Sequence, residues 1–216
     1  MNNSFGNPNK FAIQYMLLSN PHNETGILGE SWGIFKFLIE GKNICQYKIG
    51  NDTVDYKWNL LYIVEWMCEN LHHILGYDPF PLPIQGESTL ELIKNADEFE
   101  TDEDDEMYLW YQAKSSWIFR HSWFQNRGGS FLSSAYFRRI NDRIEISWNN
   151  DFYKEKGIMF IYPKGTSLIS KVEFKEVIFK FLYDILSNLD RKVSNDIKND
   201  KSYISELWKK IKLLEP

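Results

Sequence analysis

The chain of 216 residues lacks the motifs of the common catalytic and metal-binding sites. Its two cysteines, Cys45 and Cys68, are too few for a disulfide framework and do not have the spacing of metal ligands. Both lie in apolar surroundings, so we expect buried free thiols. HExxH, GxSxG, Walker and GxGxxG patterns are absent as well. The residues therefore name no reaction, and we predict neither a cofactor nor a metal site.

Long apolar runs are missing too. No stretch approaches the roughly 20 apolar residues that span a bilayer, and the first ten residues lack the basic and apolar regions of a signal peptide. We therefore expect a soluble, cytoplasmic protein without a membrane partner. The formal net charge of −5 also argues against a general attraction of the whole molecule to nucleic acid.

What the chain does contain is apolar and aromatic, with 43% hydrophobic and 16% aromatic residues, which excludes global disorder. Alternating and helical patterns predict an α+β fold: an antiparallel sheet of about five or six strands packed with about four helices. We expect a disordered N-terminus over 1–10 and a single domain over 11–216.

The predicted elements follow from turn signals, capping signals and periodicity. Four helices are expected, at 58–75, 107–125, 170–189 and 202–214, and the pattern also allows a short additional one over 89–94. The longest of these, 170–189, opens with the capping box Ser170-x-x-Glu173. Strands are expected at 11–18 and 157–163, and hairpins at 32–49 and 135–148, the latter turning at Asn141-Asp142.

Negative charge is concentrated in one segment. Residues 97–106 hold eight of the 30 acidic residues and no basic one, so we expect a solvated loop there. Without this segment, the chain has 25 basic and 22 acidic side chains. The acidity is therefore local and does not by itself exclude an anionic partner.

Directly after it, residues 107–148 combine arginine and tryptophan. This stretch has five of the six arginines, four of the eight tryptophans and a local charge of +4. Such enrichment is typical of protein interfaces and of base-stacking surfaces. The candidate partner-binding residues are Trp117, Arg120, His121, Trp123, Arg127, Arg138, Arg139 and Arg143.

Spacing refines this surface. Trp110, Lys114, Trp117 and His121 share one face of the predicted helix, because they follow at intervals of four, three and four residues. In the hairpin, neighbouring arginines point to opposite sides, and Glu145 could pair across the strands with an arginine. The competing interpretation is that the arginines bridge the acidic loop and surface carboxylates.

The order of several short motifs resembles a known module. These motifs include Trp32-Gly33, Glu65-Trp66, Pro81-Leu82-Pro83, Arg120-His121-Ser122, Gly128-Gly129, Arg138-Arg139 and Glu145-Ile146-Ser147-Trp148. The chain is similar over about residues 30–190 to the module ahead of ImmA/IrrE-type metallopeptidase domains in bacterial defence-associated proteins. Because HExxH is absent, this resemblance implies a sensing or interaction module and not a peptidase.

The leading hypothesis is a non-enzymatic recognition protein of a bacterial defence or phage-conflict system, which binds another protein through the Arg/Trp-rich surface. Three competing functions stay open. The same surface could bind nucleic acid or a nucleotide. The acidic loop could block a basic toxin, as an immunity-type inhibitor does. Finally, His121, together with Arg120 and Glu145, could form a hydrolase site.

Overall fold

The computed structural model describes residues 3–123, 130–193 and 198–214. In this part of the chain, the largest sheet has five antiparallel strands in the order β1-β2-β3-β4, with β7 paired to the beginning of β3. They are β1 (Asn3–Asn7), β2 (Phe11–Leu17), β3 (Trp32–Ile39), β4 (Lys42–Asn43) and β7 (Lys57–Asn59). Alternate residues of β3, Phe35, Phe37 and Ile39, are fully buried, which is why this run forms a strand with one core face.

The N-terminus differs from the prediction of disorder over 1–10. Residues 3–7 form β1, which pairs with β2 from Asn3 opposite Tyr15 to Asn7 opposite Phe11. At Gly6, φ is +89° and an added Cβ would lie 2.4 Å from the carbonyl oxygen of Phe11, so the strand needs glycine here. β1 is a mostly exposed edge strand, and an edge strand gives only a weak apolar signal in a sequence.

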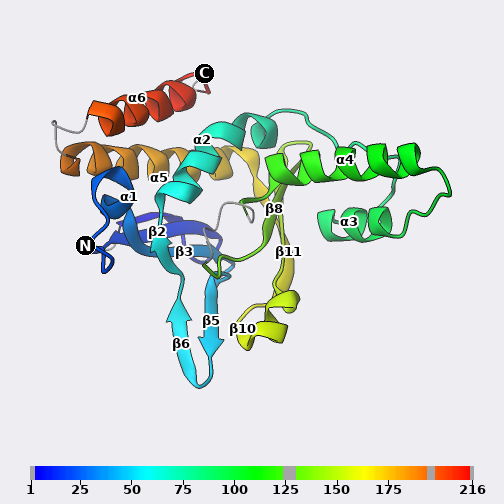
Figure 1. Ribbon diagram of the computed structural model, residues 1–216, viewed down its shortest axis with the longest axis horizontal. Coiled ribbons are helices and arrows are strands. Elements are labelled where there is room, and N and C mark those ends of the chain that lie inside the picture. The colour runs from blue at the N-terminus through cyan, green and yellow to red at the C-terminus, as the bar shows by residue number, and fades with distance from the viewer. Residues whose placement is uncertain (1–2, 124–129, 194–197, 215–216) are drawn as a thin grey trace.

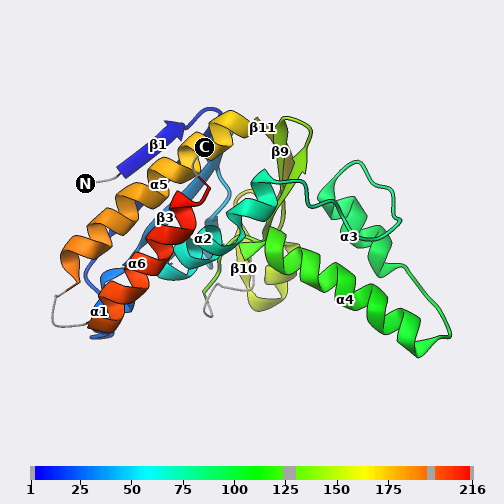
Figure 2. The same cartoon turned by 90° about the horizontal axis from the view of Figure 1, so that it is seen from above.

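α5 (Lys171–Lys192) covers this sheet on one side, and α6 (Lys198–Lys212) lies on the outer side of α5 (Figures 1 and 2). α5 packs on β1 and β2, and it begins at the predicted capping box, where Ser170 Oγ accepts from the amide of Glu173. Where α6 lies along α5, the rings of Tyr183 and Trp208 are 5.0 Å apart. The short α1 (Gly26–Glu30) contacts α5 as well.

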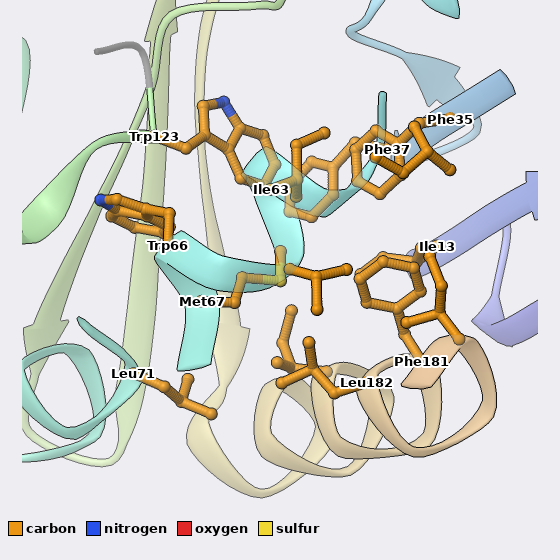
Figure 3. Packing of buried hydrophobic residues seen from close by; sticks show 14 of the residues in the cluster. Ile13, Phe35, Phe37, Ile63, Trp66, Met67, Leu71, Trp123, Phe181 and Leu182 are labelled. Carbon is orange, nitrogen blue, oxygen red and sulfur yellow. The ribbon is translucent and has the colours of Figure 1, made fainter. Parts of the chain in front are cut away.

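The main core surrounds α2 (Leu61–Leu75), which confirms most of the helix predicted over 58–75; the beginning of that stretch forms β7 instead. Figure 3 shows Ile63, Trp66 and Met67 of this helix pointing toward β3, α5 and Trp123. The Trp123 ring meets Phe37 edge to face at a centroid distance of 4.9 Å. Both cysteines are buried free thiols, as expected.

Two smaller antiparallel sheets lie beside the five-stranded one, so the described residues form three sheets where the prediction had a single sheet. One has the order β10-β5-β6 and the other β11-β9-β8. Their strands are β5 (Gln46–Ile49), β6 (Asp52–Asp55), β10 (Ile158–Phe160), β8 (Ala135–Ile140), β9 (Arg143–Asn149) and β11 (Lys164–Ser170). The predicted hairpin 135–148 is confirmed as β8–β9, with Asn141 at φ +53°. By contrast, the predicted hairpin 32–49 is split, because β5 leaves β3 and pairs with the distant β10.

A helical hairpin extends away from the main core (Figures 1 and 2). It consists of α3 (Thr89–Asp97), the connection 98–103 and α4 (Asp104–His121). The described part of the chain also has the 3-10 helix η2 (Asp151–Lys156), so helices exceed the four that were predicted. The predicted acidic loop 97–106 is shorter, because its last three acids form the first turn of α4, where the helix dipole favours negative charge.

None of the helices in the described residues has the length and apolar character required to cross a membrane.

Candidate functional site

Both candidate tryptophans are buried. The side chains of Trp117 and Trp123 are 0% exposed. The indole of Trp117 donates to the carbonyl of Asp78 at 3.1 Å, and that of Trp123 donates to the carbonyl of Ser133 at 2.7 Å. The prediction that they contact a partner at the surface is wrong, because both rings are used for packing and for internal hydrogen bonds.

Arg120 and His121 lie in a compact polar cluster around Asp78. Arg120 donates to both carboxylate oxygens of Asp78, at 2.9 and 3.3 Å. His73 Nδ1 lies 3.2 Å from Asp78 Oδ2, and His121 Nε2 lies 3.9 Å from the same oxygen. His121 also donates from Nδ1 to the carbonyl of Trp117 at 3.0 Å. The cluster thus joins the end of α4 to the segment after α2.

Burial sets the protonation of this cluster. It lowers the pKa of His121 to about 4, so the ring is neutral at pH 7. Burial and the neighbouring His72 also lower the pKa of His73. Burial of Asp78 would raise the pKa of its carboxyl group, but the hydrogen bond from Arg120 and the nearby positive charge outweigh burial and the pKa is lowered. Asp78 is therefore ionised and paired with Arg120.

Arg138 belongs to a second internal network. Its guanidinium donates from Nε to Glu145 Oε2 at 2.9 Å, which confirms the expected cross-strand pair. Glu145 is 1% exposed, and its Oε1 accepts from the amide of Thr89 at 2.6 Å and from Ser147 Oγ at 2.5 Å. This carboxylate thereby fastens the first turn of α3 to β9.

The remaining arginines do not gather with these two. Arg139 points to the opposite side of β8, as predicted, and donates to the carbonyl of Leu75 at 3.0 Å. Arg143 is exposed at the start of β9. The candidate residue Arg127 lies outside the described residues. The structure thus does not bring the described arginines and tryptophans into one exposed surface. Arg120 and Arg138 form ion pairs with Asp78 and Glu145, and neither of these carboxylates belongs to the acidic loop 97–106.

The acidic hairpin, which we define as residues 89–121, carries a net negative charge, unlike the rest of the chain. It has nine acidic and three basic side chains, whereas the rest of the chain has 21 and 22. All eight acids of 97–106 are exposed. Of these, Asp97 pairs with Lys114 and Glu98 pairs with Lys94 at 3.6 Å. Across the described residues, the other six have no ion pair within 4.0 Å.

The outer face of α4 adds apolar side chains to this charge. Tyr108, Leu109 and Phe119 are 65%, 61% and 50% exposed. The predicted face of Trp110, Lys114, Trp117 and His121 is the opposite one, which is turned toward the body of the protein. Large exposed apolar side chains beside a charged rim are typical of protein interaction sites.

No family, no curated protein and no solved structure matches this chain in the three comparisons. The resemblance to the ImmA/IrrE-associated module thus stays a prediction. Among the described residues, there is no cluster of three His, Cys, Asp or Glu side chains that could hold a metal ion.

Two features of the site are not predicted by the sequence. Asp78, the centre of the polar cluster, is 42 residues from its partner Arg120, and no local pattern links them. The exposed apolar face of α4 was not predicted, because aromatic residues occur on all sides of this helix and their positions do not distinguish buried rings from exposed ones. One signal was available: Tyr108, Gln112, Ser115 and Phe119 form a stripe of mixed polarity at helical spacing.

Proposed function

We propose that this protein is a recognition protein that binds a partner protein with a basic surface, and that the acidic hairpin makes the contact. The observation that carries the proposal is the joint exposure of eight acids and the apolar face of α4 on one projecting hairpin (Figure 2). This observation favours the hypothesis of an immunity-type inhibitor, which blocks a basic toxin, over the leading hypothesis of a protein that binds its partner through the Arg/Trp-rich surface.

Charge complementarity supports a basic partner. The six acids without an ion pair in the described part of the chain create a negative field at the tip of the hairpin. Such a field steers a cationic partner toward the hairpin and repels nucleic acid. The outer face of α4 would then supply the apolar contacts that hold the complex together.

Nucleic-acid binding and hydrolysis have less support. Arg120 and Arg138 use their guanidinium groups on Asp78 and Glu145, so they are not available as a set for phosphates. His121 is 1% exposed, which leaves a substrate no direct access to its ring. The setting in bacterial defence or phage conflict is part of the proposal and rests on the family resemblance alone.

The test is partner capture from the native host with three forms of the full chain. The first is wild type. The second carries Glu100→Gln, Asp102→Asn and Asp105→Asn. The third is a matched control with Asp52→Asn, Glu155→Gln and Glu206→Gln, which removes the same charge from exposed positions elsewhere. Each captured protein is then purified and its affinity measured at low and at high salt.

We expect a basic protein that binds wild type and the control equally. The hairpin variant should bind it about 3- to 160-fold more weakly, because three exposed ion pairs contribute about 0.2–1 kcal/mol each. High salt should reduce the difference. Equal binding by all three forms, a partner without a basic surface, or capture of nucleic acid would refute the proposal.

A further inference from the structure

A groove lies beside β1, the outermost strand of the five-stranded sheet. Among the described residues, β1 pairs with β2 on one side and with no strand on the other. The groove has a volume of ≈ 530 Å³ and lies between Phe5 of β1 and one flank of α5. Figure 2 shows β1 next to α5, at the end of the molecule opposite to α3 and α4. The groove is therefore separate from the acidic hairpin.

Aromatic rings form the floor of this groove. Phe5 lines it together with Phe179 and Tyr183 of α5. Phe5 also stacks on Tyr15 of β2 at a centroid distance of 6.3 Å, and Phe179 is only 9% exposed, so the core holds these rings in place. A preformed apolar floor of this kind loses little entropy when a side chain from outside covers it.

The free edge of β1 offers backbone groups to a further strand. The amide of Phe35 in β3 donates to the carbonyl of Tyr56, away from β2. Because the backbone groups of successive strand residues point to opposite edges, the registers of β3 with β2 and of β2 with β1 leave the N–H and C=O of Ser4 on the free side of β1. An added segment that pairs with Ser4 would place its two flanking side chains on the α5 side, next to Asn3 and Phe5.

One carboxylate in the groove lacks a positive partner. The charged residues of the lining are Glu176, Lys180 and Asp184, so their net charge is −1. Lys180 pairs with Glu176 at 2.6 Å. Asp184 accepts from the amide of Asn3 at 2.7 Å and from two further neutral groups, and it has no ion pair within 4.0 Å in the described part of the chain.

The neighbouring basic residues of α5 contact other groups. Lys175 lies over the ring of Phe179, with Nζ 5.2 Å from the ring centroid. Arg191 donates to the side-chain oxygen of Asn188 at 2.7 Å. Neither forms an ion pair with Asp184, so this carboxylate favours a cationic side chain from a partner.

We propose that an extended segment of a partner protein adds to β1 as an antiparallel strand, with an apolar side chain in the groove and a lysine or arginine two residues later beside Asp184. The spacing follows from the register, because residues two apart on a strand share a face and an antiparallel segment passes Phe5 before Asn3. Strand addition of this kind combines backbone hydrogen bonds with pockets for alternate side chains. A second copy of β1 fits less well, since β1 has no basic residue.

The experiment measures the fluorescence anisotropy of a labelled peptide, acetyl-STLTKTS-amide, during titration with the full chain. One control peptide has glutamate in place of the lysine. Another has an N-methyl group on the threonine between leucine and lysine, which removes the backbone donor opposite Ser4. The protein variants are Asp184→Asn, which keeps an acceptor for Asn3, and Asp52→Asn as the matched control on an exposed residue of β6. Sedimentation of the chain alone gives its oligomeric state.

We expect the peptide to bind wild type with a Kd below about 1 mM. The N-methyl peptide should bind at least about fivefold more weakly, because a strand hydrogen bond is lost. The glutamate peptide and the Asp184→Asn variant should each reduce the affinity about two- to fivefold. Asp52→Asn should bind like wild type. The hairpin variant of the capture experiment should do so too, because its three acids do not line the groove, so this inference and the proposed function can fail separately.

The inference is overturned if the peptide does not bind at about 1 mM, or if the N-methyl peptide binds as tightly as the unmodified one. Equal affinities of Asp184→Asn and Asp52→Asn would also overturn it. A chain that sediments as a dimer and does not dissociate on addition of the peptide would show that a second copy covers this edge, which again contradicts the inference.

Discussion

Replacing Arg138 by methionine tests the buried network that joins α3 to the sheet. Glu145 is 1% exposed, and Arg138 is its one cationic partner among the described residues. Methionine keeps much of the aliphatic volume of arginine but leaves the carboxylate without a counter-charge. Breaking a buried ion pair on one side costs about 3–5 kcal/mol, because the remaining charge stays desolvated.

This cost is large compared with a typical stability of about 5–15 kcal/mol. We expect Arg138→Met to lower the free energy of unfolding by about 3 kcal/mol or more, as measured by urea unfolding with tryptophan fluorescence. Arg143→Met is the matched control, since Arg143 is exposed on the neighbouring strand. It should change stability by less than about 0.5 kcal/mol.

A second substitution shows whether the lost counter-charge is the cause. In Glu145→Gln, the side-chain oxygen still accepts from Thr89 and Ser147, but the charge is gone. The double variant Arg138→Met/Glu145→Gln should therefore be about 1–3 kcal/mol more stable than Arg138→Met alone. A loss below about 1 kcal/mol in Arg138→Met, or a double variant no more stable than the single one, would show that the ion pair is not needed.

Further predictions concern the core and the polar cluster. Trp123→Ala should cost about 3–5 kcal/mol, seen as a lower thermal midpoint, because its ring is fully buried. His121 is neutral in the folded chain, and its pKa is lowered from 6.5 to about 4. Between these values the unfolded chain binds a proton that the folded chain does not, so stability should fall by about 3 kcal/mol as the pH drops through this window. The variant His121→Gln should have a flatter pH profile in urea unfolding. Burial raises the thiol pKa of Cys45 and Cys68 to about 12, so both should react with a thiol reagent only after unfolding.

The role of Arg138 in the fold also bears on how partner binding is tested. An Arg138 variant that fails to bind a partner would report loss of folding rather than loss of a contact. Variants of the exposed acids Glu100, Asp102 and Asp105 avoid this ambiguity, because none of the three has an ion pair in the described part of the chain. Each variant should be compared with wild type by circular dichroism before binding is measured.

Local signals predicted the elements that depend on neighbouring residues. The capping box at Ser170, the turn at Asn141-Asp142 and the periodicity of α2 are all contained in short stretches, and the structure confirms them. β6, β7 and β11 were not predicted. The first two are three or four residues long, and β11 follows Pro163 and contains Gly165, a pattern typical of a turn.

From the sequence alone, we obtained the segregation of charge, the burial of both cysteines and the pairing of Glu145 with an arginine. Each depends on composition or on strand alternation, which a sequence displays directly. The sequence also placed Trp117 and His121 on one face of α4, but only the tertiary structure decided that this face is the buried one. Its contacts with Asp78 and Phe80 come from a segment about 40 residues away, and helical periodicity carries no information on which face such a segment will cover.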